Sequence, residues 1–362
     1  MPTPDPRQLG IIDCDIHNAM ASKDVLRAYL AQRWHVYYDH LRVPGRVQLG
    51  ARPQPDFFRR DAFPPSGGAP GSDLTVLCEQ YLDPFNVRAG VLSPLDPIFW
   101  PTSGDLSLAL NAALNDWMVA EWLSQDDRLY GAISVPLEDG ARAAEEIARV
   151  AGEPRFVMVL LLVTSREPLG STKYWPIYEV AAAHGLPVAV HVAGFSGTAT
   201  ATGYPTYHAE SHLTMVMPYV AQTTSLVYSG VFDRWPTLQF VMEEGGLGWL
   251  PPLMWRLDRA WNSMRDDYPH LKVPPSQVIR EHFWLTTQPL DEPEEPAFLS
   301  QLLDQLGMDE RILFASDYPH WDFDNPDRVL PAALVGRERR EQIMTRNARG
   351  ALRLPEEVGV AR

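Results

Sequence analysis

Short apolar runs rich in β-branched residues alternate along the chain with longer stretches of helical periodicity. Runs of this length, bounded by glycine, proline or polar residues, are typical of buried strands. The sequence predicts eight of them: Leu9–His17, Val87–Leu92, Leu129–Val135, Phe156–Val163, Pro187–Val192, Leu238–Glu244, Phe283–Thr287 and Ile312–Ser316.

Helices are expected between these strands, at Asp105–Ser124, Gly140–Ala151, Trp175–Ala183, Glu210–Tyr228, Pro251–Met264 and Glu294–Leu306. Single strands that alternate with helices indicate a parallel sheet with crossover helices. Eight of them predict an α/β fold, a closed (β/α)8 TIM barrel, whose functional side chains lie at the C-terminal strand ends.

We expect residues 1–362 to form a single barrel domain. The connection at about residues 20–83 is too long for an ordinary loop after the first strand, and it carries several prolines and the Gly67-Gly68 pair. Long loops of this kind usually have a function. We interpret it as a lid or dimer arm over the barrel mouth. A last helix, at about residues 337–354, is expected to end the barrel.

The first strand closes on Asp13-Cys14-Asp15-Ile16-His17, with potential ligands at alternate positions. Side chains two apart on a strand point to the same face, so Asp15 and His17 could bind one divalent cation side by side. The alternative is an aspartate that accepts backbone hydrogen bonds and a histidine satisfied in the core. These five residues do not decide between the two.

Three other strand ends carry similar groups. The fifth strand ends in His191, either a ligand or a core histidine, and the eighth in Asp317, either a ligand or a helix cap. The sixth ends in Glu243-Glu244. Because consecutive strand residues point to opposite faces, at most one of these two faces the barrel axis.

Composition narrows the range of partners. The net charge is −15, and no basic cluster stands against it, so we expect a small-molecule ligand and neither nucleic acid nor membrane as partner. The two cysteines, Cys14 and Cys78, exclude a disulfide framework and a four-cysteine zinc site. They fit a reducing cytoplasm. No apolar stretch is long enough to span a bilayer.

Taken together, the chain resembles the amidohydrolase superfamily. It is most similar to the branch with aminocarboxymuconate semialdehyde decarboxylase and related decarboxylases, hydratases and hydrolases. The resemblance covers nearly the whole chain and rests on five segments: Asp13 to His17, Leu186 to His191, Phe232 to Leu238, Ser316 to His320, and Asn347-Ala348-Arg349.

This resemblance implies one divalent metal ion held by Asp15, His17, His191 and Asp317. Two imidazoles and two carboxylates suit zinc or manganese. Relatives are often dimers, so a homodimer is expected.

The chain departs from the family at the sixth strand, where Glu244 occupies the place of a common histidine. With Asp15, Asp317 and Glu244 ionised, a dication leaves a net charge of −1, whereas a neutral histidine would leave zero. An anionic substrate is then disfavoured, unless Arg59 or Arg60 of the long loop offsets the excess. This favours a neutral substrate.

The leading hypothesis is therefore hydrolysis of a small neutral amide, ester or lactone by a metal-activated water. Asp317 would accept the proton of the water, and Glu244 would assist. His320 and His208 are candidates for binding the substrate. The alternative is a metal-dependent, non-oxidative decarboxylase of a hydroxylated aromatic or unsaturated acid, and a third possibility is a barrel without catalytic activity.

Overall fold

In the computed structural model the described residues are 10–40, 58–95, 104–192, 203, 207–352, 354–355 and 358; the side chains of His208 and Ser211 lie outside the description. Within them an eight-stranded parallel sheet runs in the order of the chain. Its strands are β1 (Ile11–Ile16), β2 (Val87–Leu92), β3 (Leu129–Ser134), β4 (Phe156–Leu162), β5 (Val188–His191), β6 (Phe240–Glu243), β7 (Phe283–Thr286) and β8 (Ile312–Leu313). The eight predicted strands are confirmed, although several are shorter than expected.

The sheet closes on itself through β8 and β1. Cys14 N–H donates to Phe314 O (2.9 Å), His17 N–H donates to Tyr318 O (2.7 Å), and Asp317 N–H donates to Asp15 O (3.1 Å). These bonds bring the carboxyl ends of the first and last strands together. The TIM barrel is therefore confirmed, and the predicted ligands of β1 and β8 lie side by side.

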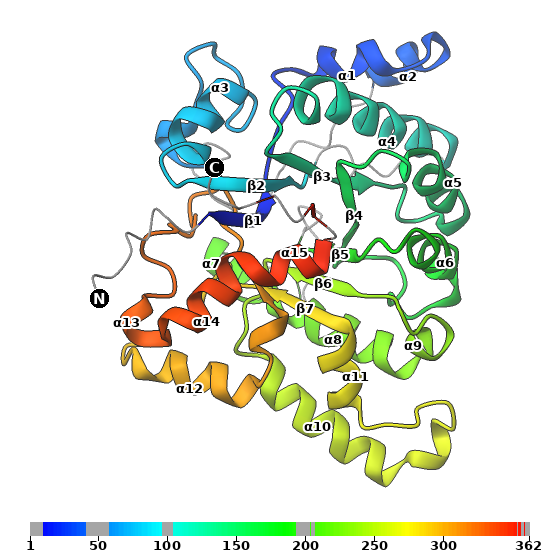
Figure 1. Cartoon of the computed structure of the whole chain (residues 1–362). Coiled ribbons are helices and arrows are strands. Elements are labelled where there is room, and N and C mark those ends of the chain that lie inside the picture. The colour runs from blue at the N-terminus through cyan, green and yellow to red at the C-terminus, as the bar shows by residue number, and fades with distance from the viewer. Residues whose placement is uncertain are drawn as a thin grey trace.

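Helices surround the barrel (Figure 1). In the described part of the chain they are α1 (Lys23–Tyr29), α2 (His35–His40), α3 (Leu74–Leu77), α4 (Gly104–Met118), α5 (Gly140–Val150), α6 (Trp175–His184), α7 (His208–Leu213), α8 (Val216–Tyr228), α9 (Val231–Arg234), α10 (Leu250–Ser263), α11 (Pro275–His282), α12 (Ala297–Leu306), α13 (Ala332–Val335), α14 (Arg337–Glu341) and α15 (Asn347–Leu352). The single helix expected at Glu210–Tyr228 is two, α7 and α8. None of the described helices is long and apolar enough to cross a lipid bilayer.

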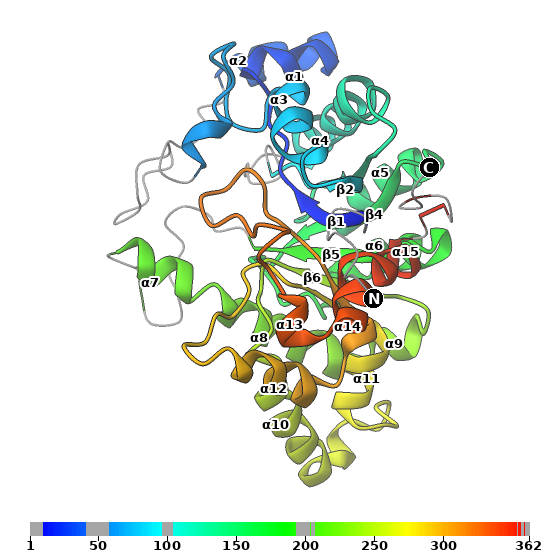
Figure 2. The ribbon, with the colours of Figure 1, turned by 60° about the vertical axis from the view of Figure 1, so that its left-hand side comes forward.

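Two apolar clusters form the core. Strand residues such as Val190 and Met242 pack outward against the helices, whereas Ala189 and Val241 lie in a second cluster inside the barrel. Leu352 of α15 belongs to the inner cluster, so this helix closes the N-terminal end of the barrel. Figure 2 shows α15 and α7 on opposite sides of the barrel, which leaves the C-terminal end as the mouth.

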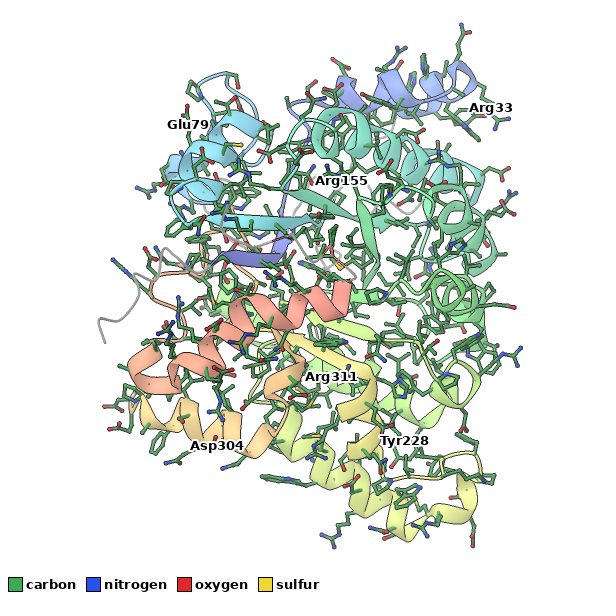
Figure 3. The ribbon with its side chains drawn as sticks, in the orientation of Figure 1. Arg33, Glu79, Arg155, Tyr228, Asp304 and Arg311 are labelled. Carbon is green, nitrogen blue, oxygen red and sulfur yellow. The ribbon has the colours of Figure 1, made fainter. Side chains whose placement is uncertain are left out.

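Polar side chains hold the loops at the closed end. Arg311, labelled in Figure 3, precedes β8, stacks over Trp284 of β7 (4.5 Å to the ring centroid) and donates to Gln239 Oε1 (2.7 Å). Arg155, also labelled there, precedes β4 and pairs with Asp127 (2.7 Å). These contacts are structural, because they lie at the ends of the strands opposite to the ligands.

The described part of the long connection after β1 reaches the mouth. Phe58 forms an antiparallel bridge with His320, and Arg59 N–H donates to Pro319 O (3.0 Å). The connection therefore lies against the loop that follows β8. Its role as a lid or dimer arm stays a prediction.

Candidate metal centre

Asp15 and His17 lie at the carboxyl end of β1, and both are buried. The ring of His17 is fixed by Nδ1–H, which donates to the carbonyl of Ser93 after β2 (2.7 Å). Since a carbonyl only accepts, Nδ1 carries the proton, and Nε2 of the neutral ring is left with a lone pair. Its Nε2 lies 3.6 Å from Asp15 Oδ1.

Asp13 does not share their environment, so the simple alternation expected for this segment is wrong. Ile12 and Cys14 lie in the inner cluster, and the strand register shifts between Asp13 and Ile16. The carboxylate of Asp13 instead accepts hydrogen bonds from Tyr81 and Ser316. It ties β1 to the end of β8 and is no part of the ligand cluster.

His191 ends β5 and is completely buried. Its Nδ1–H donates to the carbonyl of Val192, and its ring packs edge-on against the ring of His17, with centroids 4.9 Å apart. The second imidazole therefore also directs Nε2 toward the barrel axis, 3.2 Å from Asp15 Oδ2.

Asp317 follows β8 with a left-handed backbone (φ 59°), an unusual conformation for a residue with a side chain. Its Oδ1 lies 2.9 Å from His17 Nε2 and contacts His320 Nδ1, and its Oδ2 accepts a hydrogen bond from Gln288 Nε2 (3.2 Å). The carboxylate is thus held on both oxygens beside the β1 ligands.

The structure answers which glutamate of β6 faces the site. Glu243 continues the inward alternation of Val241 and is fully buried in the barrel, where neither carboxyl oxygen has a hydrogen-bond partner among the described residues. Glu244 follows in a left-handed conformation (φ 56°), and its Oε2 lies 3.1 Å from His191 Nε2. Glu244 is therefore the glutamate at the ligand cluster.

The donor set fits one divalent cation. Donor atoms of Asp15, His17, His191 and Glu244 all lie within 4.8 Å of one another, and Asp317 lies against His17. Both oxygens of Asp15 and Nε2 of both histidines are buried without a hydrogen-bond partner among the described groups. Buried polar atoms left in this way are costly unless they bind something. The cluster is suited to one metal ion.

Burial and neighbouring charges shift the pKa values of Asp317 and Glu244 in opposite directions. Although burial opposes it, contact with His320 and His17 holds the pKa of Asp317 well below its usual range. Burial raises the pKa of Glu244 well above its usual range, and Asp317 adds to this effect. For His17, burial is outweighed by Asp15 and Asp317, which raise its pKa to about 9.

The residues predicted to bind substrate lie at different distances from the donor cluster. His320 stands at the mouth between His17 (ring centroids 4.7 Å apart) and Phe58 (5.3 Å). Arg59 pairs with Asp61 (2.7 Å) and stacks over Phe323. Arg60 is exposed on a short 3-10 helix outside the cluster. His208 begins α7, but its side chain lies outside the described part of the structure.

Sequence reasoning missed Gln288 and Ser93. Gln288 is completely buried after β7, holds Asp317 through Nε2, and has an Oε1 without a partner among the described groups. The polar run Thr286-Thr287-Gln288 at a strand end is a signal that could have found it. Ser93 acts on His17 through its backbone carbonyl, which no side-chain pattern reveals.

The fold and this cluster define a barrel with a donor cluster suited to one metal ion at its mouth. The amidohydrolase family model matches residues 12–354, and the chain belongs to that family of enzymes.

Several of the similar proteins are decarboxylases. The gamma-resorcylate decarboxylase of Polaromonas sp. is 28% identical over 66% of this chain and 75% of its own length. That of Rhodococcus jostii is 28% identical over 76% and 86%. The solved dihydroxybenzoic acid decarboxylase of Polaromonas sp., with bound manganese and the inhibitor 2-nitroresorcinol, superposes with a TM-score of 0.66 at 19% identity over 96% of this chain and 97% of that one. The superposition supports the fold.

These relatives overturn the hydrolysis of a neutral amide, ester or lactone expected from the sequence. The kinship favours the alternative, a carboxy-lyase. The error lay in the count of charges, which gave each acid its usual ionisation. A formal count of charges was therefore too weak a basis for excluding an anionic substrate.

Proposed function

We propose that this protein is a metal-dependent, non-oxidative decarboxylase of a hydroxylated aromatic acid. The observation that carries the proposal is the coincidence of the buried donor cluster with the kinship to gamma-resorcylate decarboxylases. The neighbouring rings of Phe58 and His320 at the mouth support an aromatic substrate, since they offer aromatic surface beside the cluster.

Asp15, His17, His191 and Asp317 would hold the cation, and manganese is our first choice because a solved relative contains it. When bound, the cation supplies Lewis-acid polarisation of the substrate oxygens. The Nδ1–H bonds of His17 and His191 to backbone carbonyls keep both Nε2 atoms directed at it. Such supporting contacts fix ligand orientation in metal sites.

The reaction requires one proton. When the bond between the ring carbon and the carboxylate breaks, carbon dioxide leaves and the electron pair stays on the ring carbon, where a proton must replace the lost group. We assign this transfer to the pair of Asp317 and His320, because Asp317 Oδ1 contacts His320 Nδ1 and His320 is 19% exposed at the mouth. His320 can take up this proton at the mouth, and Asp317 holds the ring of His320 beside the cluster.

Manganese-loaded protein should release carbon dioxide from 2,6-dihydroxybenzoate or another hydroxybenzoate, measured by mass spectrometry and by loss of the substrate absorbance. Asp317→Asn should fold and lose turnover. The absence of carbon dioxide from a panel of mono- and dihydroxybenzoates, with protein that holds one manganese per chain, would refute the proposal.

Two further expectations belong to this proposal. We expect a homodimer, which light scattering on the eluted protein would test by mass. A cytoplasmic location agrees with the free thiols of Cys14 and Cys78, and fractionation of the source cells would test it.

A further inference from the structure

We propose that Glu244 is itself a metal ligand, and that it makes this an oxygen-rich site that prefers manganese to zinc. The inference rests on the metal-dependent site put forward above, but not on decarboxylation.

The backbone turns Glu244 toward the cluster. Strict alternation after Val241 would direct Glu243 inward and Glu244 outward, against the helices. The left-handed conformation at Glu244 reverses this direction, and a non-glycine residue adopts it only at a steric cost. A conformation of that cost persists only where the surroundings impose it.

Three neighbours impose the turn. Thr286 Oγ1 of β7 accepts a hydrogen bond from Glu244 N–H (3.0 Å), and the hydroxyl of Tyr219 from α8 donates to the carbonyl of Glu243. A Cβ atom at Gly245 would lie 3.3 Å from the ring of Tyr219, so only glycine fits there without a shift. The fold therefore directs the carboxylate of Glu244 at one place.

The carboxylate of Glu244 lies against Nε2 of His191. The Nδ1–H of His191 donates to a backbone carbonyl, so in the neutral ring Nε2 carries a lone pair. Glu244 Oε2 lies 3.1 Å from this nitrogen, and Asp15 Oδ2 lies 3.2 Å from the same nitrogen. Lone pairs at such distances repel one another unless a proton or a metal cation lies among them.

The donor count decides the preferred metal. Donor atoms of Asp15, His17, His191 and Glu244 lie within 4.8 Å of one another, and Asp317, which contacts His17, brings the number of nearby carboxylates to three beside two imidazoles. Zinc usually takes four ligands in a tetrahedron, whereas manganese suits carboxylate-rich, octahedral sites. A tetrahedral ion, which binds four ligands, could not use all five of these side chains.

The test compares Glu244→Gln with two matched variants, Glu243→Gln and Asp322→Asn. Glu243 is the adjacent buried glutamate outside the donor cluster, and Asp322 is a carboxylate that contributes to the field at Glu244 without being a ligand. Isothermal titration of metal-free protein with Mn²⁺ and with Zn²⁺ gives each affinity. Urea unfolding of the metal-free variants checks that each one folds.

Glu244→Gln should bind Mn²⁺ at least about 10–100-fold more weakly, a loss known from groups that only support ligands. Its affinity for Zn²⁺ should fall less, and both control variants should stay close to wild type. Equal losses in Glu244→Gln and Asp322→Asn would show an effect of charge alone and would overturn the ligand role. Unchanged Mn²⁺ affinity in Glu244→Gln would do the same.

A second measurement needs no variant. A crystal structure of the wild-type protein with Mn²⁺ should place a Glu244 oxygen at bonding distance from the ion. A carboxylate that reaches only a metal-bound water would overturn the inference. Neither result depends on carbon dioxide release, so the ligand role and the decarboxylase proposal can fail separately.

Discussion

Removal of the Asp13 carboxylate should destabilise the protein more than any single change outside the metal cluster that we consider. This buried group accepts four hydrogen bonds: from Asp15 N–H (3.1 Å), Ser316 N–H (3.0 Å), Ser316 Oγ–H (2.5 Å) and the hydroxyl of Tyr81. It joins β1, the end of β8 and the segment before β2. The perturbation is Asp13→Ala, compared with Asp13→Asn and Tyr81→Phe.

The expected magnitudes follow from the bonds that each variant loses. Asp13→Ala leaves four buried donors without an acceptor, and at about 1 kcal/mol of net stability for each the loss is about 4 kcal/mol. Asp13→Asn keeps the oxygen that accepts the two backbone bonds, so about 1–2 kcal/mol is expected. Tyr81→Phe removes one donor and should cost about 1 kcal/mol. Domains of this kind are stable by about 5–15 kcal/mol, so the first loss is large.

Urea unfolding of the metal-free proteins, followed by circular dichroism, measures these free energies. The order Asp13→Ala, then Asp13→Asn, then Tyr81→Phe is the prediction. Mn²⁺ affinity should also fall in Asp13→Ala, because Asp15 and Asp317 lie on the two segments that Asp13 joins. If Asp13→Ala loses no more stability than Tyr81→Phe, the four bonds do not act as the structure implies.

The barrel could be predicted because its physical signal is strong. Strands covered on both faces read as unbroken apolar runs, as in Phe156–Leu162, and their carboxyl ends must share one mouth. Because the strand ends share one mouth, His191 and Asp317 could be expected to lie near Asp15 and His17. The end of β8 was less predictable, since the ladder stops at Leu313 and the next residues bond to β1.

Other features depend on backbone geometry that a period of two cannot reveal. The left-handed turn at Glu244 reverses the direction of its side chain, and the register shift after Asp13 separates it from Asp15. Backbone carbonyls that orient the histidines leave no trace in the sequence. The reaction was mispredicted because a formal count of charges is too weak a basis for choosing the class of substrate.

Three further predictions concern the metal, a supporting amide and pH. Chelation should abolish carbon dioxide release, and Mn²⁺ at 100 times its dissociation constant should restore it and add about 2.7 kcal/mol of stability, read as a rise in melting temperature; activity that survives chelation would contradict this. Gln288→Leu should lower kcat about 10–100-fold and leave the fold intact, because Asp317 Oδ2 loses its donor; unchanged kcat would remove Gln288 from the site. In the metal-free protein, burial raises the pKa of Asp324 from 3.8 to about 7, against a hydrogen bond from Leu290 N–H. The folded state holds this proton more tightly than the unfolded state, so the proton stabilises the fold. This stabilisation is complete below pH 4 and is lost as the pH rises through 7. The free energy of unfolding falls by at most about 4 kcal/mol. Asp324→Asn should therefore weaken the fall in stability between pH 4.5 and 7.5 in urea titrations, and a slope equal to that of the wild type would show that Asp324 ionises normally in the folded protein.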